Sequence, residues 1–307
     1  MSYDYKNKKC IVSGGSGFLG QGVVKKLLDE GAEVWVIDNF SYGASRKNLD
    51  KRAKLIFGDV RDEKVFKKLP SKKFDYFFHF AAPSSAVLFK KNPEGCFDIT
   101  IKGFINAINY CAKRKIRLIY PSSAKVYMGR KTPFSEKDRI KKEFLDEYAR
   151  AKLAEEEIAF AYKDICDSLG LRIFAGFGPS EKHKDEFASV VSLFSKDLIR
   201  GKKPVVWGDG NQARDFIYEE EITEIILTLA QKAKEPIVNV GTGKKVSYNY
   251  LIKTINNILG KKIKPKYVRS KLFLGDTQAD TGLLRKYYPK FKWSFEEGVK
   301  AVVESLL

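Results

Sequence analysis

The chain has 307 residues, of which 44% are hydrophobic and 31% are charged, a globular balance that excludes a disordered chain. No apolar run reaches the roughly 20 residues of a membrane helix, and Met1–Lys9 lacks the apolar stretch of a signal peptide, so we expect a cytoplasmic protein. The formal charge of +19 comes from 44 lysines and 13 arginines scattered along the chain. Because DNA-reading proteins favour arginine, this pattern indicates a site for small anionic ligands rather than for nucleic acid.

Short apolar runs alternate with longer helical patterns through the first 175 residues. Expected strands are Cys10–Ser13, Val34–Asp38, Leu55–Phe57, Tyr76–Phe80, Arg117–Tyr120 and Leu171–Phe174. Expected helices between them are Phe18–Glu30, Glu63–Leu69, Glu94–Lys113 and Phe144–Leu169. Continuous apolar strands joined by helical crossovers predict a parallel sheet that is covered on both faces.

The pattern changes after Gly178-Pro179. A loop over Ser180–Glu186 is followed by expected helices at Ala188–Arg200, Glu220–Lys232 and Phe295–Leu306, with a strand at Ile237–Val240. The segments Pro204–Trp207 and Ser247–Ile258 lie between these elements. We therefore expect a Rossmann-like, doubly wound α/β fold. Its first domain would span residues 1–175, residues 216–240 would return to its sheet, and residues 176–307 would form a smaller cap.

A glycine-rich turn follows the first strand and opens the first helix. Gly14, Gly17 and Gly20 have the spacing GxxGxxG, with Phe18 and Leu19 between the last two. Glycines at this position let backbone amides approach a pyrophosphate at the helix N-terminus. The second strand ends in Asp38, whose carboxylate can bind ribose hydroxyls and would repel a 2′-phosphate. We expect NAD as the cofactor, with NADP as the alternative because Arg46 and Lys47 follow closely.

A Tyr and a Lys four residues apart on a helix share one face, where the ammonium can stabilise a phenolate. The chain has five such pairs, and chance predicts about two, so the spacing alone decides nothing. Tyr148/Lys152 stands out because it opens a long helical pattern and follows Ser122-Ser123 at a strand end. A serine there can hydrogen-bond the substrate oxygen on which the tyrosine acts. The other pairs are Tyr5/Lys9, Tyr127/Lys131, Tyr267/Lys271 and Tyr288/Lys292.

With these residues in place, the chain resembles the extended short-chain dehydrogenase/reductases that act on nucleotide sugars, essentially from end to end. The motifs that carry the resemblance are Gly14–Gly20, Gly58-Asp59-Val60, His79-Phe80-Ala81-Ala82, Pro121–Tyr127, Tyr148/Lys152, Gly178-Pro179, Arg214–Tyr218 and Asn239–Gly243.

The resemblance implies roles for particular residues. Ser123, Tyr148 and Lys152 would be the catalytic trio, with Ser122 also at the substrate. Asp59 would contact the adenine, and further cofactor contacts would come from Asn39, Val60, Ala81 and Ala82. The nucleotide base of the substrate would lie against Val206 and Trp207, and Arg214 would bind the diphosphate. The family also implies a homodimer formed through the helices near Glu94–Lys113 and Phe144–Leu169.

Three further segments narrow the resemblance. The 4,6-dehydratases have an acidic pair just after the catalytic hydroxyl, where this chain has Ala124 and Lys125, so dehydration is disfavoured. Residues 178–184 and 277–280 are similar to ADP-heptose 6-epimerases and related 4-epimerases. In the heptose enzymes the lysine that matches Lys184 is a second acid/base on the other face of the sugar. A surface lysine remains the alternative.

Three positions depart from the family pattern. Thr100 and Ala175 stand where the family has Asn, which supports the active-site lysine in the first case and the substrate phosphate in the second; Met128 stands where it has Gly. The lost phosphate contact could come instead from a basic cluster, from Arg269 in particular. The alternative is that the substrate sits differently. The cluster comprises Lys261, Lys262, Lys264, Lys266, Arg269 and Lys271.

These observations lead to one preferred function and two alternatives. Four cysteines without a CxxC pair and only two histidines predict no metal site. We expect an NAD-dependent nucleotide-sugar epimerase that oxidises a hydroxyl to a ketone and returns hydride to the other face. The alternatives are a dehydrogenase or keto-sugar reductase with the same site and a net redox change, and a non-catalytic Rossmann-fold RNA-binding protein.

Overall fold

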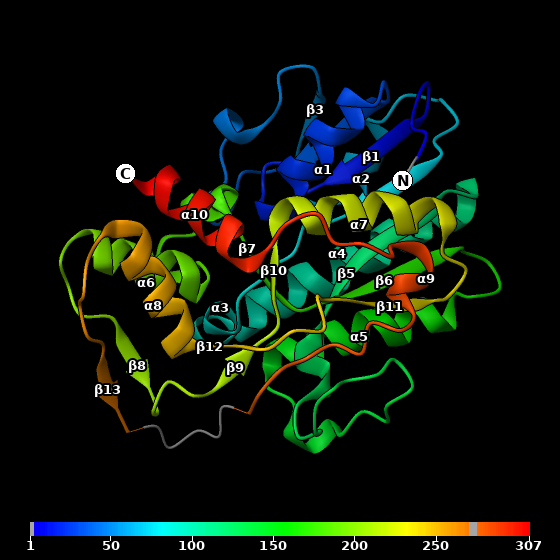
Figure 1. Cartoon of the computed structure of the whole chain (residues 1–307). Helices are drawn as coiled ribbons and strands as arrows, with labels where there is room; N and C mark the ends of the chain where they lie inside the picture. The colour runs from blue at the N-terminus through cyan, green and yellow to red at the C-terminus, as the bar shows by residue number, and fades with distance from the viewer. Residues whose placement is uncertain (1–2, 270–274) are drawn as a thin grey trace.

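The computed structural model describes residues 3–269 and 275–307, and its centre is a sheet of seven parallel strands (Figure 1). The strand order is β11-β6-β5-β4-β1-β2-β3. The strands are β1 (Lys9–Ser13), β2 (Glu33–Asp38), β3 (Lys54–Phe57), β4 (Tyr76–His79), β5 (Arg117–Ser123), β6 (Ser168–Ile173) and β11 (Ile237–Val240). The predicted Rossmann-like α/β class is confirmed.

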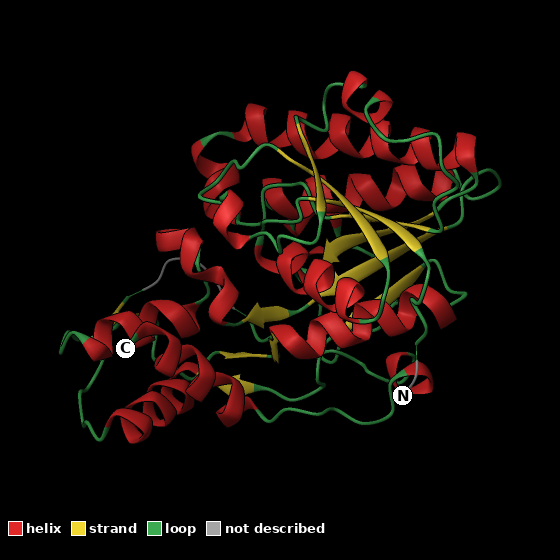
Figure 2. Cartoon of the chain, turned by 90° about the horizontal axis from the view of Figure 1, so that it is seen from above, coloured by secondary structure: helices red, strands yellow, loops and turns green. Residues whose placement is uncertain are grey.

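Helices cover both faces of this sheet (Figure 2). Successive strand residues point to opposite faces, so Val12 joins the core under α1 (Phe18–Asp29) and α7 (Glu219–Lys232). Its neighbour Ile11 joins a second core under α4 (Pro93–Arg114) and α5 (Glu147–Ala161). Burial on both faces explains why the strands are apolar runs without a polar alternation.

The strand order also determines where a ligand can bind. From β1 the chain builds β2 and β3 on one side and then crosses to β4 on the other. Loops leaving the carboxyl ends of β1 and β4 therefore diverge, which opens a crevice at that edge of the sheet. Ser13 and His79 end these two neighbouring strands in register.

A third core lies beside the sheet and is built by the C-terminal half of the chain (Figure 1). Its helices are α6 (Val190–Ile199), α8 (Tyr248–Leu259) and α10 (Phe295–Leu306). Three strand pairs accompany them: β7 (Ala175–Phe177) with β10 (Phe216–Tyr218), β8 (Val205–Trp207) with β13 (Lys266–Val268), and β9 (Ala213–Arg214) with β12 (Val246–Ser247). This group corresponds to the expected smaller cap.

The remaining elements are short. They are α2 (Lys64–Lys67), α3 (Ala86–Lys91), α9 (Leu284–Tyr287), and the 3-10 turns η1 (Arg46–Asn48), η2 (Ala124–Tyr127), η3 (Lys142–Phe144) and η4 (Pro179–Phe187). Across the described ranges 3–269 and 275–307, no helix combines the length and apolarity needed to span a bilayer.

The helix expected over Phe144–Leu169 is wrong at both ends. The Asp146 carboxylate accepts the Ala149 N–H at 2.9 Å and starts α5 one residue later. The helix ends at Ala161, and Leu169 lies in β6, paired with Ile119. An apolar run at the end of an amphipathic helix does not reveal by periodicity that it continues as a buried strand. The expected loop over Ser180–Glu186 is likewise a 3-10 turn, η4.

Candidate active site

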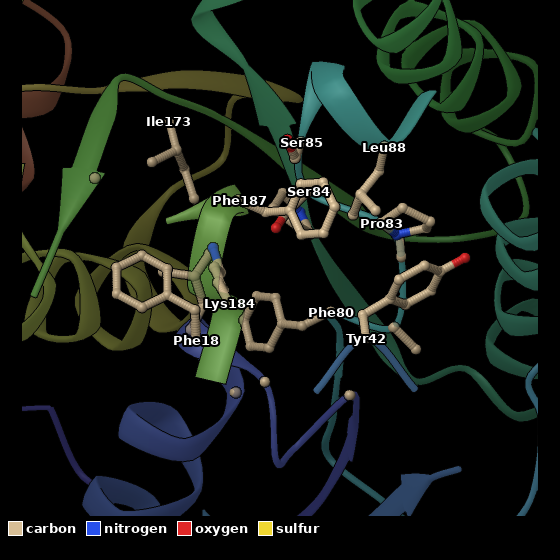
Figure 3. A pocket seen from close by; sticks show the side chains of 18 of the residues that line it. Phe18, Tyr42, Phe80, Pro83, Ser84, Ser85, Leu88, Ile173, Lys184 and Phe187 are labelled. Atoms are coloured by element: carbon tan, nitrogen blue, oxygen red, sulfur yellow. The ribbon is translucent and has the colours of Figure 1, made fainter. Parts of the chain in front are cut away.

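A cavity of about 450 Å³ lies at the carboxyl ends of the central strands, and the third core closes one side of it. Loops after β1, β2, β3 and β4 line it, as do the ends of β5 and β6 and the side chains of Arg214 and Tyr248. Figure 3 shows Phe18 and Lys184 side by side at one side of the cavity and Tyr42 at the other, with Phe80 between them. The crevice that the strand order opens is therefore the site.

The glycine-rich turn is built for close backbone approach. Gly14 has φ +69°, and a Cβ there would lie 2.7 Å from the backbone of Phe80 and Ala81. A Cβ at Gly20 would lie 2.0 Å from the Gly14 carbonyl oxygen. Helix α1 starts from this turn at Gly17 without a side-chain cap, and its first turn holds no acidic residue. Its free N-terminal amides and the positive end of its dipole suit an anionic group.

Carboxylates stand at the far end of the cavity. Asp38 accepts the Ser16 N–H at 2.9 Å and the Phe40 N–H at 2.8 Å, which holds its side chain at the cavity wall. Asp59 accepts Asn39 Nδ2 at 3.1 Å, and hydrogen bonds from Arg61 keep the pKa of Asp59 below its ordinary value. Negative charge at this end fits unmodified ribose hydroxyls better than a 2′-phosphate. Val60, Ala81 and Ala82 line the same wall.

Ser123, Tyr148 and Lys152 all line the cavity. Ser123 ends β5, and the Asp146 cap places Tyr148 in the first turn of α5, with Lys152 one turn later. Burial raises the pKa of Tyr148, whereas the Lys152 ammonium and a hydrogen bond with Ser123 lower it. The arrangement joins a serine, a phenol and an ammonium, which is the set that a proton transfer at a sugar hydroxyl requires.

Lys152 has a different partner from the one the resemblance implies. The Thr100 hydroxyl is buried and makes no hydrogen bond within the described part of the chain. Lys152 Nζ instead donates to Glu155 Oε2 at 2.9 Å. The Lys152 and Glu155 side chains are only 3% and 1% exposed, so this ion pair is shielded from water.

Lys184 reaches the cavity from η4. Its ammonium lies 4.4 Å from the centre of the Phe18 ring, and burial lowers its pKa below the ordinary value. Two carboxylates, the buried Glu181 and the half-buried Glu219, tether η4. Glu219 accepts the Ser180 N–H, and Glu181 accepts the Ser189 N–H at 2.8 Å. Lys184 is half-buried, and its surroundings favour release of its proton.

Only some of the residues expected to bind the substrate line the cavity. Ser122, Arg214 and Ala175 line the cavity, and the Arg214 guanidinium lies 5.5 Å from the Tyr248 ring. Val206 is buried, Trp207 and Arg269 are exposed, and none of these three lines the cavity. Lys271, in the same basic cluster as Arg269, falls outside the described residues.

Sequence analysis missed several residues of the cavity wall, among them Tyr42, Phe187 and the Pro83–Ala86 segment. Tyr42 and Pro83–Ala86 follow β2 and β4, so the rule that ligands bind beyond the carboxyl ends of parallel strands could have indicated them. Nothing in the local pattern indicated Phe187. It reaches the cavity because η4 packs against α1 and α6.

A parallel sheet in this order, with a glycine-rich turn at its crossover point and a Ser, Tyr and Lys at one cavity, defines a Rossmann-type enzyme class. The chain matches the NAD dependent epimerase/dehydratase family over residues 10–241, and it belongs to that family. The resemblance seen in the sequence is thereby confirmed.

Individual relatives are nucleotide-sugar epimerases by name. A putative UDP-glucose 4-epimerase of Methanocaldococcus jannaschii is 31% identical over 255 residues, which is 81% of this chain and 82% of that protein. The structure of UDP-N-acetylglucosamine 4-epimerase from Methanobrevibacter ruminantium M1, in complex with UDP-N-acetylmuramic acid, has a TM-score of 0.89 at 29% identity and 98% coverage of both chains. The Helicobacter pylori ADP-L-glycero-D-manno-heptose-6-epimerase has a TM-score of 0.89 at 26% identity, covering 100% of this chain and 98% of that one.

Proposed function

We propose that the protein is an NAD-dependent nucleotide-sugar epimerase that inverts a sugar carbon by way of a transient ketone. The observation that carries this proposal is the meeting of Ser123, Tyr148, Lys152 and Lys184 at one cavity that also holds the glycine-rich turn. The names of the similar 4-epimerases and of the heptose epimerase support the same reaction class.

The residues present fit NAD. The Gly14–Gly20 turn would hold the pyrophosphate, Asp38 the adenosine ribose, and Asp59 with Val60 the adenine. NAD bound in this cradle would supply the hydride chemistry, accepting hydride from a sugar carbon and returning it. The Asp38 carboxylate favours NAD over NADP.

The protein residues would manage the protons. In the oxidation, the Tyr148 phenolate takes the hydroxyl proton of the sugar, the O–H bond breaks, and a C=O bond forms as hydride leaves the same carbon. Ser123 hydrogen-bonds that oxygen, and Lys152 stabilises the phenolate. Lys184, from η4, would be the acid/base for the other face of the ketone, so that the return step restores C–H and O–H bonds with no net redox change.

The substrate would be a nucleoside-diphosphate sugar. Arg214 lines the cavity and would bind the diphosphate, because guanidinium suits bidentate phosphate contacts. The base would extend beyond the cavity toward the backbone of β8 at Val206 and Trp207, and the exposed Arg269 would supply the phosphate contact that Ala175 lacks. We also propose that residues 1–175 and 216–240 form the NAD-binding unit and that the rest of 176–307 binds the substrate; the pairing of β11 with β6 supports the return.

The experiment follows purified protein with NAD and a panel of ADP-, GDP-, UDP-, CDP- and dTDP-linked hexoses and heptoses. Nicotinamide absorbance and the NMR spectrum of the sugar are recorded in the same sample. We expect a new epimer without net NADH, and we expect Tyr148→Phe to abolish it while the exposed control Tyr250→Phe does not. Lasting NADH with a keto sugar would instead establish a dehydrogenase and overturn the proposal.

A further inference from the structure

Three consecutive glutamates on α5 have three different cationic partners. Glu155 pairs with Lys152 at 2.9 Å, and Glu157 pairs with Lys142 on the surface. Between them, Glu156 accepts two hydrogen bonds from the Arg172 guanidinium, at 2.9 and 2.6 Å, and one from the Ser122 hydroxyl. Arg172 is therefore the ion-pair partner of Glu156, and Lys152 is the ion-pair partner of Glu155.

The pair is isolated from water and from other cations. Both side chains are at most 3% exposed, and within the described residues no other Lys or Arg lies within 4.0 Å of the Glu155 carboxylate. A buried carboxylate and a buried ammonium are each costly alone, so the charge of one depends on the other. Lys152 thus has a counter-ion that its helix supplies, three residues further along.

The other ionisable groups around the pair are either neutral or bonded to other cations. His79 faces Lys152 from β4, and burial lowers its pKa to about 3, so it is neutral. Tyr120 faces the glutamates from β5, and burial raises its pKa, so it is neutral as well. At the start of α5 the Asp146 carboxylate is bonded to Lys125 from η2. Glu155 therefore balances the ammonium that acts on Tyr148.

We propose that Glu155 is a positioning residue that holds Lys152 and, through it, determines the pH range in which Tyr148 works; this inference rests on the proposed function. Burial raises the pKa of Glu155 to about 7, against the opposing effect of Lys152, so the carboxylate becomes ionised through the neutral range. Where Glu155 is ionised, it partly neutralises the ammonium. Without that carboxylate, the unbalanced ammonium would favour the phenolate more strongly, and the lysine itself would lose its proton more readily.

Both effects have the same sign. The acidic limb of kcat/KM reports deprotonation of Tyr148, and the alkaline limb reports deprotonation of Lys152. In Glu155→Gln we expect both limbs to move to lower pH by about half a unit to one unit, the size expected for one nearby charge. Glu155→Asp keeps the charge and should leave the limbs close to those of the wild type even where kcat falls.

The test measures pH profiles of epimerisation for the wild type, both Glu155 variants, and the control Glu157→Gln on the same helix. Unshifted limbs in Glu155→Gln, whatever the rate, would show a merely structural role and overturn the inference. If the wild type turns over no nucleotide sugar, the proposed function fails. The inference is then decided by the ultraviolet titration of Tyr148, taken as the difference from Tyr148→Phe, with and without Glu155→Gln.

Folding is checked by circular dichroism. If Glu155→Gln does not fold, the double variant Lys152→Met/Glu155→Gln removes both charges. A folded double variant, in which Tyr148 titrates at higher pH than in the wild type because the ammonium is gone, supports the pairing. A double variant as unfolded as the single one would overturn it.

Discussion

At the scale of single residues, we propose that Lys184 is the second acid/base, which acts on the other face of the ketone from Tyr148. Its ammonium sits against the Phe18 ring and lines the same cavity as Tyr148. An epimerase that returns hydride to the second face of a ketone benefits from an acid/base on that side as well. The lowered pKa of Lys184 fits a group that gives up its proton more readily than an ordinary lysine.

Replacing Lys184 by Met should therefore lower kcat of epimerisation by about 10²–10⁴-fold, because a general acid/base contributes on that scale. The binding of NAD, measured by calorimetry, should change little. The exposed neighbour Lys182, bonded to the Ser305 carbonyl, provides the control Lys182→Met. If Lys184→Met retained the wild-type kcat, Lys184 would have no acid/base role.

We propose that Asp38 is the residue that selects NAD over NADP. Asp38→Asn removes the charge at the cavity wall and keeps the side chain nearly the same size. We expect the ratio of NADP to NAD affinity to rise about tenfold or more, since a like charge facing the 2′-phosphate is lost. Paired calorimetric titrations with NAD and NADP measure this ratio. The control is Asp50→Asn, a half-buried aspartate that does not line the cavity. An unchanged ratio in Asp38→Asn would rule out Asp38 as the selecting group.

At the scale of elements, the start of α5 determines where Tyr148 points. The Asp146 side chain caps the helix, and Lys125 bonds the same carboxylate. Asp146→Ala should lower the free energy of unfolding by about 1 kcal/mol, the usual value of an N-cap. Urea denaturation measures the loss. Glu147→Ala, exposed in the same turn, should cost clearly less, and equal losses would show that the cap contributes nothing specific.

The tether of η4 predicts a pH-dependent stability. Burial raises the pKa of Glu219 to about 7, so the folded chain holds a proton that the unfolded chain, near the ordinary Glu value, has released. The contribution of Glu219 is thus present below about pH 4.5 and is lost as the pH rises through 7. Glu219→Gln should flatten this fall in the unfolding free energy between about pH 5 and 7, as urea titrations at several pH values would reveal. An unchanged slope would mean that Glu219 is ionised throughout.

At the scale of the whole molecule, the outer surface of α4 and α5 carries apolar side chains. Ile105 is 36% exposed and Phe160 is 64% exposed, although both helices are otherwise well packed on the sheet. The family resemblance implies a homodimer through these helices, and such side chains are typical of an interface. We therefore propose the homodimer as the working form.

Phe160→Glu should convert that dimer to a monomer, because burying an unpaired charge in an apolar interface is unfavourable. Analytical ultracentrifugation compares it with the wild type and with Tyr250→Glu, a control at an exposed aromatic position on α8. A wild-type chain that sediments as a monomer would contradict the proposal directly.

The strands were predicted more accurately from the sequence than the connections between elements. The strands β1, β2 and β11 lie close to where their apolar runs predict them, because a strand buried on both faces has a composition of its own. The predicted boundary between α5 and β6 was wrong. An apolar residue such as Leu169 suits a buried helix and a buried strand equally, and only its pairing with Ile119 makes it a strand residue.

The sequence by itself determined the local chemistry: a glycine-rich turn between strand and helix, an acid at the end of β2, and a Tyr and a Lys one helical turn apart. These signals are short in range, so they can be read from spacing alone. The tertiary structure alone decided that Lys152 is held by Glu155 and not by Thr100, and that η4 brings Lys184 and Phe187 to the cavity. The physical reason is that burial and the choice of partner depend on which segments the folded chain packs together, and residue spacing does not report that.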